Sequence, residues 1–148
     1  MIIGVGGLPG SGKETVARIF EKYGFEYCYR NNLIEKKKDF DSEKNYVIVP
    51  VTKKKDLEIF SEIKNFNFIF IYSDWKFRYK RWGNKIKNEP WKWKTYKEFM
   101  KYEEVTKEFL NIANSKNKYY SIKNDTSKNK LEEKVLETIL KIKSKDNK

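Results

Sequence analysis

The stretch MIIGVGGLPGSGKET, residues 1–15, begins with a short apolar run that leads into a glycine-rich segment, residues 7–13. A helical pattern starts directly after that segment. Strand, glycine-rich loop and helix in this order make a phosphate-binding loop, in which glycines let successive backbone N–H groups point inward at an anion. The N-terminus of the following helix adds its partial positive charge. The stretch therefore predicts a nucleotide phosphate site. The alternative is a decayed loop that keeps this shape and binds little.

The residues expected to bind the nucleotide are those of the loop and the first helical turn: Gly7, Leu8, Pro9, Gly10, Ser11, Gly12, Lys13, Glu14 and Thr15. Lys13 would supply a full positive charge to the β- and γ-phosphates. The next position normally holds a Ser or Thr whose hydroxyl binds Mg²⁺, and here it holds Glu14. Thr15 points about a third of a helical turn away from that position. We therefore expect Thr15, or in its place Glu14, to hold the metal.

Composition indicates one globular domain, residues 1–148, with a frayed tail at 143–148. Hydrophobic residues make up 39% of the chain and aromatic residues 16%, which a disordered chain would not contain. The sequence has no His and one Cys, which excludes histidine bases, histidine metal ligands and an internal disulfide. No apolar run is long enough to span a membrane, and the apolar start is too short and glycine-rich for a signal peptide. These features predict a cytoplasmic protein without a membrane partner.

The formal net charge is +12, which favours polyanionic partners such as nucleotides, nucleic acid or acidic lipid. Lysine is also spread along the whole chain beside many Asn and Ile. That usage is typical of AT-rich genomes and accounts for much of the excess without any function.

Apolar patterns predict strands that alternate with helices along the chain. Further strands are expected at 25–29, 46–51, 66–72 and 119–122, and helices at 14–23, 53–64, 74–87, 95–113 and 127–142, with a polar loop and one short helix over 30–43. The alternation predicts a three-layer α/β fold with a parallel five-stranded sheet in the order 2-3-1-4-5 and a short basic lid. Right-handed crossovers would bring the loops after residues 7, 29, 51 and 73 to one edge of the sheet.

The segment 74–87 supplies cations directly after a strand. Arg78 and Arg81 are three residues apart on one helix face and would reach over bound phosphates, although a solvated basic face has the same pattern. Four tryptophans are interleaved with lysines in this part of the chain: Trp75, Trp82, Trp91 and Trp93. Such rings pack a flap onto a domain, stack nucleic-acid bases, or stack on the base of an acceptor.

Acidic groups are sparse where phosphoryl transfer needs them. Asn31 and Asn32 follow the second strand, and no acid follows the third strand before Asp56. Asp39 and Asp41 in the polar loop are the convenient candidates. Cys28 is expected to be a small core residue, because no base partner for a thiolate is evident.

The segment 7–13, GLPGSGK, resembles the loop of small-molecule and nucleoside monophosphate kinases, particularly the dephospho-coenzyme A kinase type. Residues 68–72, Arg78-x-x-Arg81, and residues 95–99 with Glu103 or Glu104 are similar to an archaeal uncharacterised P-loop family related to those kinases. Segments 112–125 and 131–133 resemble the end of that family. The resemblance implies that the loop after the last strand lies against the adenine, with Asn124 near the base.

Two departures from that family concern the acceptor side. The family has Asp-Gly-x-Arg after its third strand, where this chain has residues 49–52, VPVT. Between the second and third strands, the family also has a longer insertion than this chain, which has about fifteen residues there. That insertion is the usual acceptor-binding region.

The sequence therefore predicts an ATP- and Mg²⁺-dependent phosphotransferase that acts on a nucleotide or a nucleotide-like metabolite. Its expected catalytic residues are Lys13, Arg78 and Arg81. One alternative is a nucleic-acid-associated binding protein with a degenerate nucleotide site, and another is an NTPase that is not a kinase.

Overall fold

A computed structural model describes residues 1–36, 40–86, 110–111 and 118–146 of the chain. The strands are β1 (Ile2–Gly7), β2 (Phe25–Tyr29), β3 (Asn45–Val49), β4 (Phe66–Tyr72) and β5 (Tyr119–Lys123). The helices are α1 (Lys13–Lys22), α2 (Arg30–Lys36), α3 (Lys54–Ser61), α4 (Trp75–Ile86) and α6 (Lys128–Asp146). The helix expected over 95–113 lies outside the described residues, apart from residues 110–111, which are helical.

The five strands in the described residues are all parallel, and their order in the sheet is β2-β3-β1-β4-β5. The α/β fold class and the strand order predicted from the sequence are thus confirmed. Because every strand runs the same way, the loops after β1, β2, β3 and β4 all leave from the carboxyl edge of the sheet.

Element ends differ from the expected ones where local chemistry intervenes. β3 ends at Val49, two residues early, because Pro50 has no N–H to continue the ladder. α3 ends at Ser61 because the chain must turn into β4 through Asn65, whose φ is 66°. α6 continues to Asp146 instead of ending in a frayed tail at residue 143, and the last turns bury Ile142.

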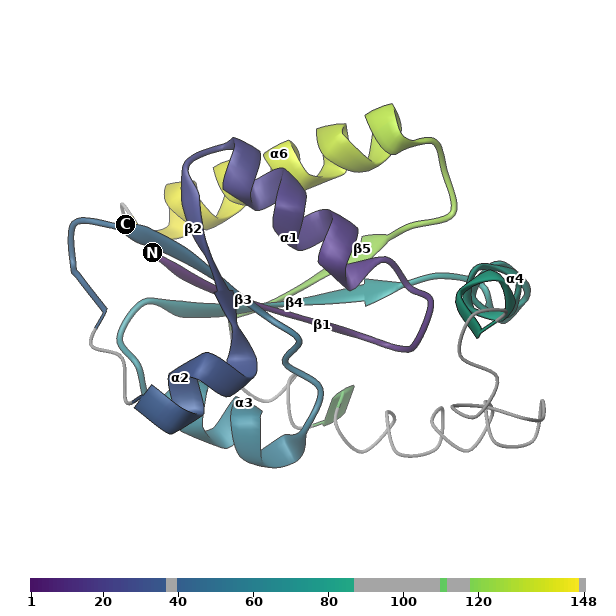
Figure 1. The fold of residues 1–148 in the computed structure, drawn as a ribbon. Helices are drawn as coiled ribbons and strands as arrows, with labels where there is room; N and C mark the ends of the chain where they lie inside the picture. Colours follow the sequence, from purple (N-terminus) through teal and green to yellow (C-terminus); the bar gives the residue numbers. More distant parts are fainter. Residues whose placement is uncertain (37–39, 87–109, 112–117, 147–148) are drawn as a thin grey trace.

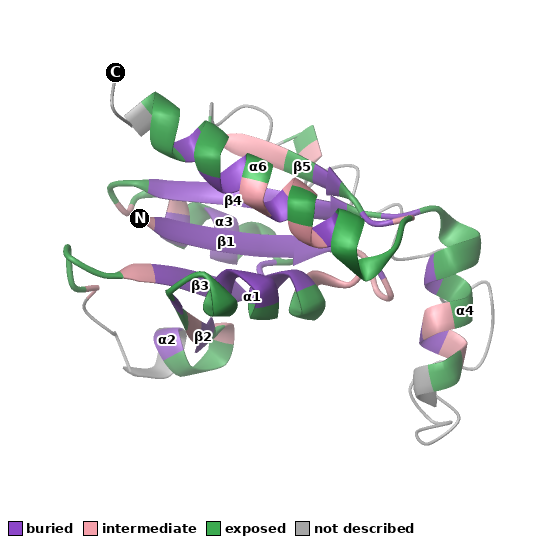
Figure 2. Ribbon diagram, turned by 90° about the horizontal axis from the view of Figure 1, so that it is seen from above, coloured by how far each residue is buried: buried purple, intermediate pink, exposed green. Residues whose placement is uncertain are grey.

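Side chains alternate between the two faces of the sheet and build two cores. Ile3 and Val5 point to the face that α1 and α6 cover, where they pack with Phe20 and Val135. Ile2 and the even-numbered apolar residues of β2, β3 and β4 point to the face that α2 and α3 cover (Figure 1). The members of this second core are Ile2, Cys28, Leu33, Tyr46, Ile48, Val51, Leu57, Phe60, Phe66, Phe68 and Phe70. β1 and β4 are therefore buried along almost their whole length (Figure 2).

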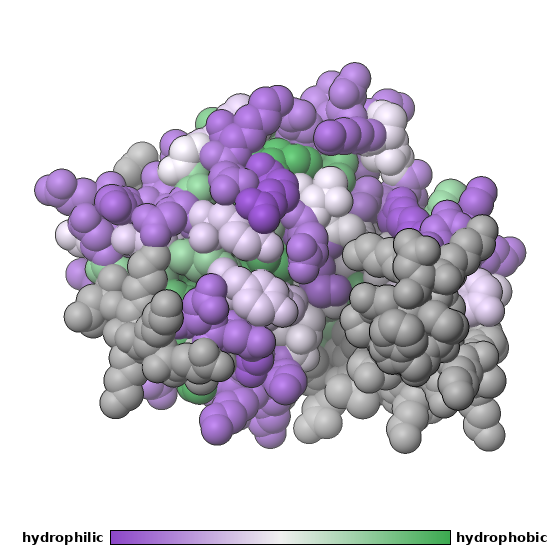
Figure 3. Space-filling view, viewed as in Figure 1, coloured by the Kyte–Doolittle hydropathy of each residue, from purple (hydrophilic) through white to green (hydrophobic). Residues whose placement is uncertain are grey.

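α4 differs from the other helices because it extends beyond the carboxyl edge of the sheet instead of covering a face (Figure 2). In the view of Figure 3, hydrophilic side chains cover most of the described surface and apolar ones show in small patches. Within the described ranges, no helix has the length and apolar character needed to cross a bilayer.

Candidate phosphate-binding site

The glycine-rich loop leaves the carboxyl end of β1 and leads directly into α1 (Figure 1). The N–H of Ser11 donates to the carbonyl of Leu8 at 3.1 Å, which closes a turn at the tip of the loop. The N–H of Val16 donates to the carbonyl of Gly12 at 3.0 Å, which begins the helix. The structure thus has the strand, loop and helix that the sequence predicts.

Two glycines in the loop are required by both conformation and space. Gly10 has a φ of 75° and Gly12 a φ of 92°, in the left-handed region that favours glycine. A Cβ on Gly10 would lie 2.5 Å from the carbonyl oxygen of Arg78, and a Cβ on Gly12 would overlap the side-chain nitrogen of Asn124. The loop is therefore closely packed on its outer side.

The inner side of the loop suits an anion. No side chain among the described residues caps the N-terminus of α1 at Gly12, so the first N–H groups of the helix are not neutralised in that way. The Ser11 side chain is fully buried, and its hydroxyl has no hydrogen-bond partner within the described part of the chain. Such a buried hydroxyl is costly unless a bound group completes it. Lys13, the first residue of α1, adds its charge to this end of the helix.

The two residues expected to hold a metal, Glu14 and Thr15, are exposed in the first turn of α1. The described residues contain no group of three or more His, Cys, Asp or Glu side chains that would bind a metal ion by themselves. A metal at this site would therefore depend on Thr15 or Glu14 together with the nucleotide phosphates.

Arg78 and Arg81 lie against the loop. Arg78 is 1% exposed, and its Nε donates to the carbonyl of Ser73 at 3.0 Å. One terminal nitrogen of Arg81 donates to the Gly10 carbonyl and to the Ser73 hydroxyl, both at 3.3 Å. Its other terminal nitrogen donates to the carbonyl of Asn124 at 2.9 Å. Both arginines expected to face the phosphates are thus close to the loop and are bonded to its surroundings.

Asn124 is the first residue after β5, and it is buried. Its side-chain nitrogen donates to the carbonyl of Ser11 at 2.8 Å, and its backbone N–H donates to the carbonyl of Tyr72 at 2.8 Å. The residue expected near the adenine therefore contacts the glycine-rich loop itself.

Asp125 completes this arrangement, although no sequence pattern pointed to it. Its carboxylate accepts hydrogen bonds from the Ser73 hydroxyl at 2.5 Å and from the backbone N–H of Asp74 at 3.0 Å. Lys123 lies 3.3 Å away. Burial opposes ionisation, but these hydrogen bonds outweigh it and lower the pKa of the Asp125 carboxyl. The available signal was that polar pairs directly follow the adjacent strands β4 and β5.

A second polar contact at the carboxyl edge joins Arg30, directly after β2, to Asp56 in α3. A terminal nitrogen of Arg30 lies 2.5 Å from one carboxylate oxygen of Asp56, and Asp56 is fully buried. The first acid after the third strand is thus paired with the cation that follows the second strand, a contact that the sequence does not predict.

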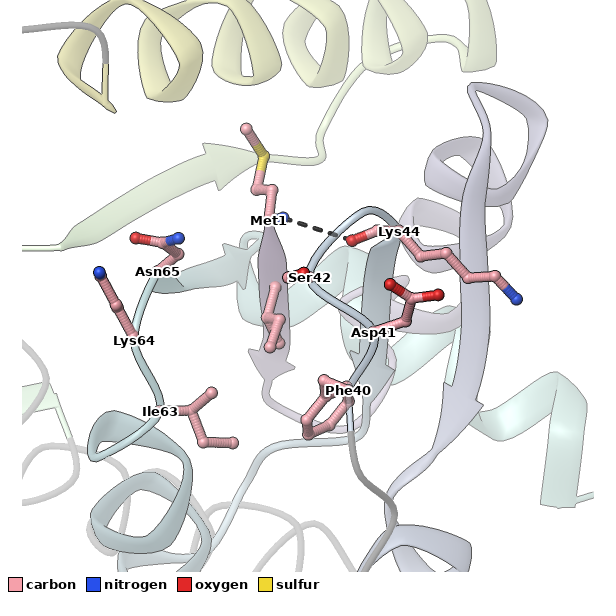
Figure 4. A pocket seen from close by; sticks show the side chains of 9 residues that line it. Met1, Phe40, Asp41, Ser42, Lys44, Ile63, Lys64 and Asn65 are labelled. Carbon is pink, nitrogen blue, oxygen red and sulfur yellow. Dashed lines mark hydrogen bonds between the residues drawn. The ribbon is translucent and has the colours of Figure 1, made fainter.

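A cavity of about 250 Å³ lies beside the start of β1, at the amino edge of the sheet (Figure 4). Phe40 and Ile63 stand on opposite sides of it, and Asp41 lines it. Because Asp41 is at the amino edge, the expectation that it serves the phosphate site is wrong. Asp39 lies outside the described residues.

The tryptophans of the basic segment are not equivalent. Trp82 is buried, whereas Trp75 at the start of α4 is 38% exposed. Trp91 and Trp93 lie outside the described residues. Cys28 is buried in the core, as expected.

No protein-family model matches this chain, and no curated protein matches it. Solved structures do match over nearly the whole chain. A gluconokinase from Sinorhizobium meliloti is 11% identical with a TM-score of 0.56, over 95% of this chain and 91% of its own. A sugar kinase from Janibacter is 13% identical with a TM-score of 0.52, over 93% of each chain. An uncharacterized protein from Eubacterium ventriosum is 20% identical with a TM-score of 0.61, over 94% and 98%. The chain thus shares its overall fold with these three proteins.

Proposed function

We propose that this protein binds ATP through the loop of residues 7–13 and transfers the γ-phosphoryl group to a small acceptor. The observation that carries the proposal is the conformation of the loop at the N-terminus of α1. Gly10 and Gly12 have left-handed backbone conformations, and neither position has space for a side chain on the outer side of the loop. The buried Ser11 hydroxyl and the first turn of the helix leave donors for an anion on the other side.

Phosphoryl transfer requires mainly positioning and positive charge. In the proposed site, the backbone of residues 7–12 holds the phosphates and Lys13 neutralises the β- and γ-oxygens. Bound Mg²⁺ would supply further charge neutralisation, with Thr15 or Glu14 as its protein ligand. Arg78 and Arg81 add two positive charges beside the loop.

The acceptor is proposed to be a nucleotide or a nucleotide-like metabolite, following the resemblance of the loop to dephospho-coenzyme A and nucleoside monophosphate kinases. The structural neighbours add a second class to test, because one is described as a gluconokinase and another as a sugar kinase. An acceptor screen therefore includes dephospho-coenzyme A, the nucleoside monophosphates, gluconate and simple sugars.

Calorimetric titration of ATP, with and without Mg²⁺, tests the site directly. We expect micromolar binding that Mg²⁺ strengthens and that Lys13→Ala weakens at least roughly tenfold, the loss of a charge-assisted contact. Lys54→Ala removes the same charge from an exposed position of α3 and is the matched control. Equal binding by Lys13→Ala and wild type would show that the loop is not the nucleotide site.

ADP release then separates the enzymatic alternatives. Release that depends on one of the acceptors supports a kinase, whereas slow release without any acceptor supports an NTPase that is not a kinase. No release under either condition would count against both.

A binding role for nucleic acid has one observation in its favour. α4 carries the exposed aromatic residues Trp75, Phe77 and Tyr79 beside the exposed cations Lys76 and Lys80. Aromatic rings among cations stack bases and pair phosphates of single strands. Binding of a thymidine oligonucleotide that falls steeply with salt, and that Phe77→Ala weakens, would support this role. Salt-insensitive binding, or none at low salt, would contradict it.

A further inference from the structure

The outer side of the loop is held by two side chains from distant parts of the chain. Arg81, in α4, bonds the carbonyl of Gly10, which is 71 residues away in the sequence. Asn124, after β5, bonds the carbonyl of Ser11, which is 113 residues away. α4 itself approaches so closely that its backbone at Arg78 leaves no space for a Cβ on Gly10.

The bond to the Ser11 carbonyl sets the direction of an N–H group that a phosphate would meet, and the bond to the Gly10 carbonyl holds the turn closed by Ser11 and Leu8. In a trans peptide the C=O and the following N–H point in opposite directions. Holding the Ser11 carbonyl toward Asn124 therefore turns the N–H of Gly12 away from Asn124. That is the direction in which a phosphate-binding loop must present its donors.

The two side chains are themselves fixed. Asn124 is held by its backbone, which donates to Tyr72 and accepts from Arg81. Arg81 also donates to the Ser73 hydroxyl oxygen, and this hydroxyl donates to the carboxylate of Asp125. The hydrogen bonds thus run continuously from Asp125 through Ser73 and Arg81 to the loop.

We propose that Asn124 and Arg81 are positioning residues, which hold the phosphate-binding loop in its binding conformation from the outer side. With Ser73 and Asp125 they form one unit, here called the loop clamp. The effect of the clamp on ligand binding rests on the proposed function, because the clamp affects binding only if the loop binds phosphates. Its effect on the loop itself does not depend on any ligand.

The clamp makes a prediction that differs from a contact between Asn124 and the adenine. A positioning residue acts on the conformation of the loop. Its loss therefore lowers the affinities for ATP and for inorganic tripolyphosphate by the same factor. Loss of a residue that contacts the base lowers the affinity for ATP alone. Comparing the two ligands therefore separates the two roles.

The variants are Asn124→Leu, which keeps the approximate shape and the backbone bond from Arg81 but loses the donor to Ser11, and Arg81→Gln. Asn84→Leu makes the same change as Asn124→Leu, and Lys80→Gln removes a positive charge as Arg81→Gln does; both lie at exposed positions of α4 and are the controls. Arg81→Lys is a further variant, because it keeps the charge but not the three bonds, and it serves if Asn124→Leu does not fold.

Amide hydrogen exchange without any ligand is the first measurement. The Ser11 N–H, bonded to Leu8, reports on the loop, and the Val51 N–H, which follows β3 and is bonded to Val5 of β1 at 2.9 Å, is the reference. We expect Asn124→Leu to accelerate exchange at Ser11 roughly threefold to tenfold, the loss of about one hydrogen bond, and to leave Val51 unchanged. Unchanged exchange at Ser11, or equal acceleration at both amides, would overturn the proposal.

Titration of ATP and of tripolyphosphate, each with Mg²⁺, is the second measurement. We expect both affinities to fall by the same factor, roughly threefold to tenfold, in Asn124→Leu and not in the two controls. A loss confined to ATP would overturn the proposal and place Asn124 at the base. If wild type binds neither ligand, the proposed function fails and the exchange measurement alone decides on the clamp.

Discussion

At the scale of the residue, a few backbone positions decide whether the loop can form. Gly10 and Gly24 have similar left-handed conformations, with φ values of 75° and 87°. They differ in their surroundings, because a Cβ on Gly24 would meet nothing within 4 Å. Comparing an alanine substitution at each of the two glycines therefore separates the cost of conformational strain from the cost of close packing.

We predict that Gly24→Ala lowers the free energy of unfolding by about 1 kcal/mol, the cost of a left-handed alanine. Gly10→Ala should cost about 1–3 kcal/mol more, because the backbone of Arg78 cannot move aside without displacing α4. Urea denaturation of both variants measures the difference. Equal losses would show that α4 does not pack on Gly10.

A second residue-scale prediction concerns Asp125. Its pKa is lowered in the folded protein, so the carboxylate stabilises the fold fully above the ordinary carboxyl pKa, about 4. That stabilisation is lost as the pH falls from about 4 through the lowered pKa. Asp125→Asn keeps an acceptor oxygen but not the charge, and should cost about 1 kcal/mol at pH 7.

Urea unfolding at a series of pH values from 7 to 2 checks this. The difference in unfolding free energy between wild type and Asp125→Asn should shrink below pH 4. A difference that is constant over that range would mean that the charge of Asp125 contributes nothing.

At the scale of the element, the helices on one face of the sheet are joined by an ion pair. Arg30 begins α2 and Asp56 lies in the first turn of α3, with one carboxylate oxygen bonded to Arg30. The other oxygen is buried and has no hydrogen-bond partner among the described residues. Removing one partner from such a pair costs more than removing both, because a lone buried charge remains.

We therefore predict that Arg30→Met lowers the free energy of unfolding by about 3 kcal/mol. The double variant with Asp56→Leu should recover most of that loss, and a double-mutant cycle by urea denaturation measures the coupling. The exposed pair of Arg18 and Glu21 on α1 is the control, and Glu21→Gln should cause no measurable loss. Additive losses in the cycle would show that Arg30 and Asp56 do not interact.

At the scale of the whole molecule, the parallel sheet separates two edges with different properties. The carboxyl edge carries the loop, the clamp and the pair of Arg30 and Asp56. The amino edge carries the cavity lined by Phe40 and Ile63. Ligand binding at the carboxyl edge should stabilise the whole domain, because α1, β1 and β4 belong to its central layers.

We predict that ATP with Mg²⁺, at about one hundred times its dissociation constant, raises the free energy of unfolding by about 2.7 kcal/mol. Thermal unfolding should shift upward in wild type and much less in Lys13→Ala at the same concentration. Lys54→Ala should shift as wild type does. An equal shift in Lys13→Ala would place the nucleotide elsewhere on the molecule.

Much of this fold could be predicted from local patterns. β2 and β4 have their predicted bounds, since each is a compact run with strong strand preference. The ends of β3 and α3 were less predictable, because Pro50 and Asn65 act through hydrogen bonds and turns that hydrophobic periodicity does not contain.

The sequence by itself determined the strand order and the place of the glycine-rich loop, because periodicity, glycine spacing and the handedness of crossovers are local or general properties. Only the tertiary structure showed that Asn124 and Arg81 bond the outer carbonyls of the loop, and that Asp41 faces the opposite edge. Contacts between side chains 71 and 113 residues apart depend on how the ends of strands β1, β4 and β5 come together. The carbonyl that each side chain reaches is set by packing around those ends, which no local pattern encodes.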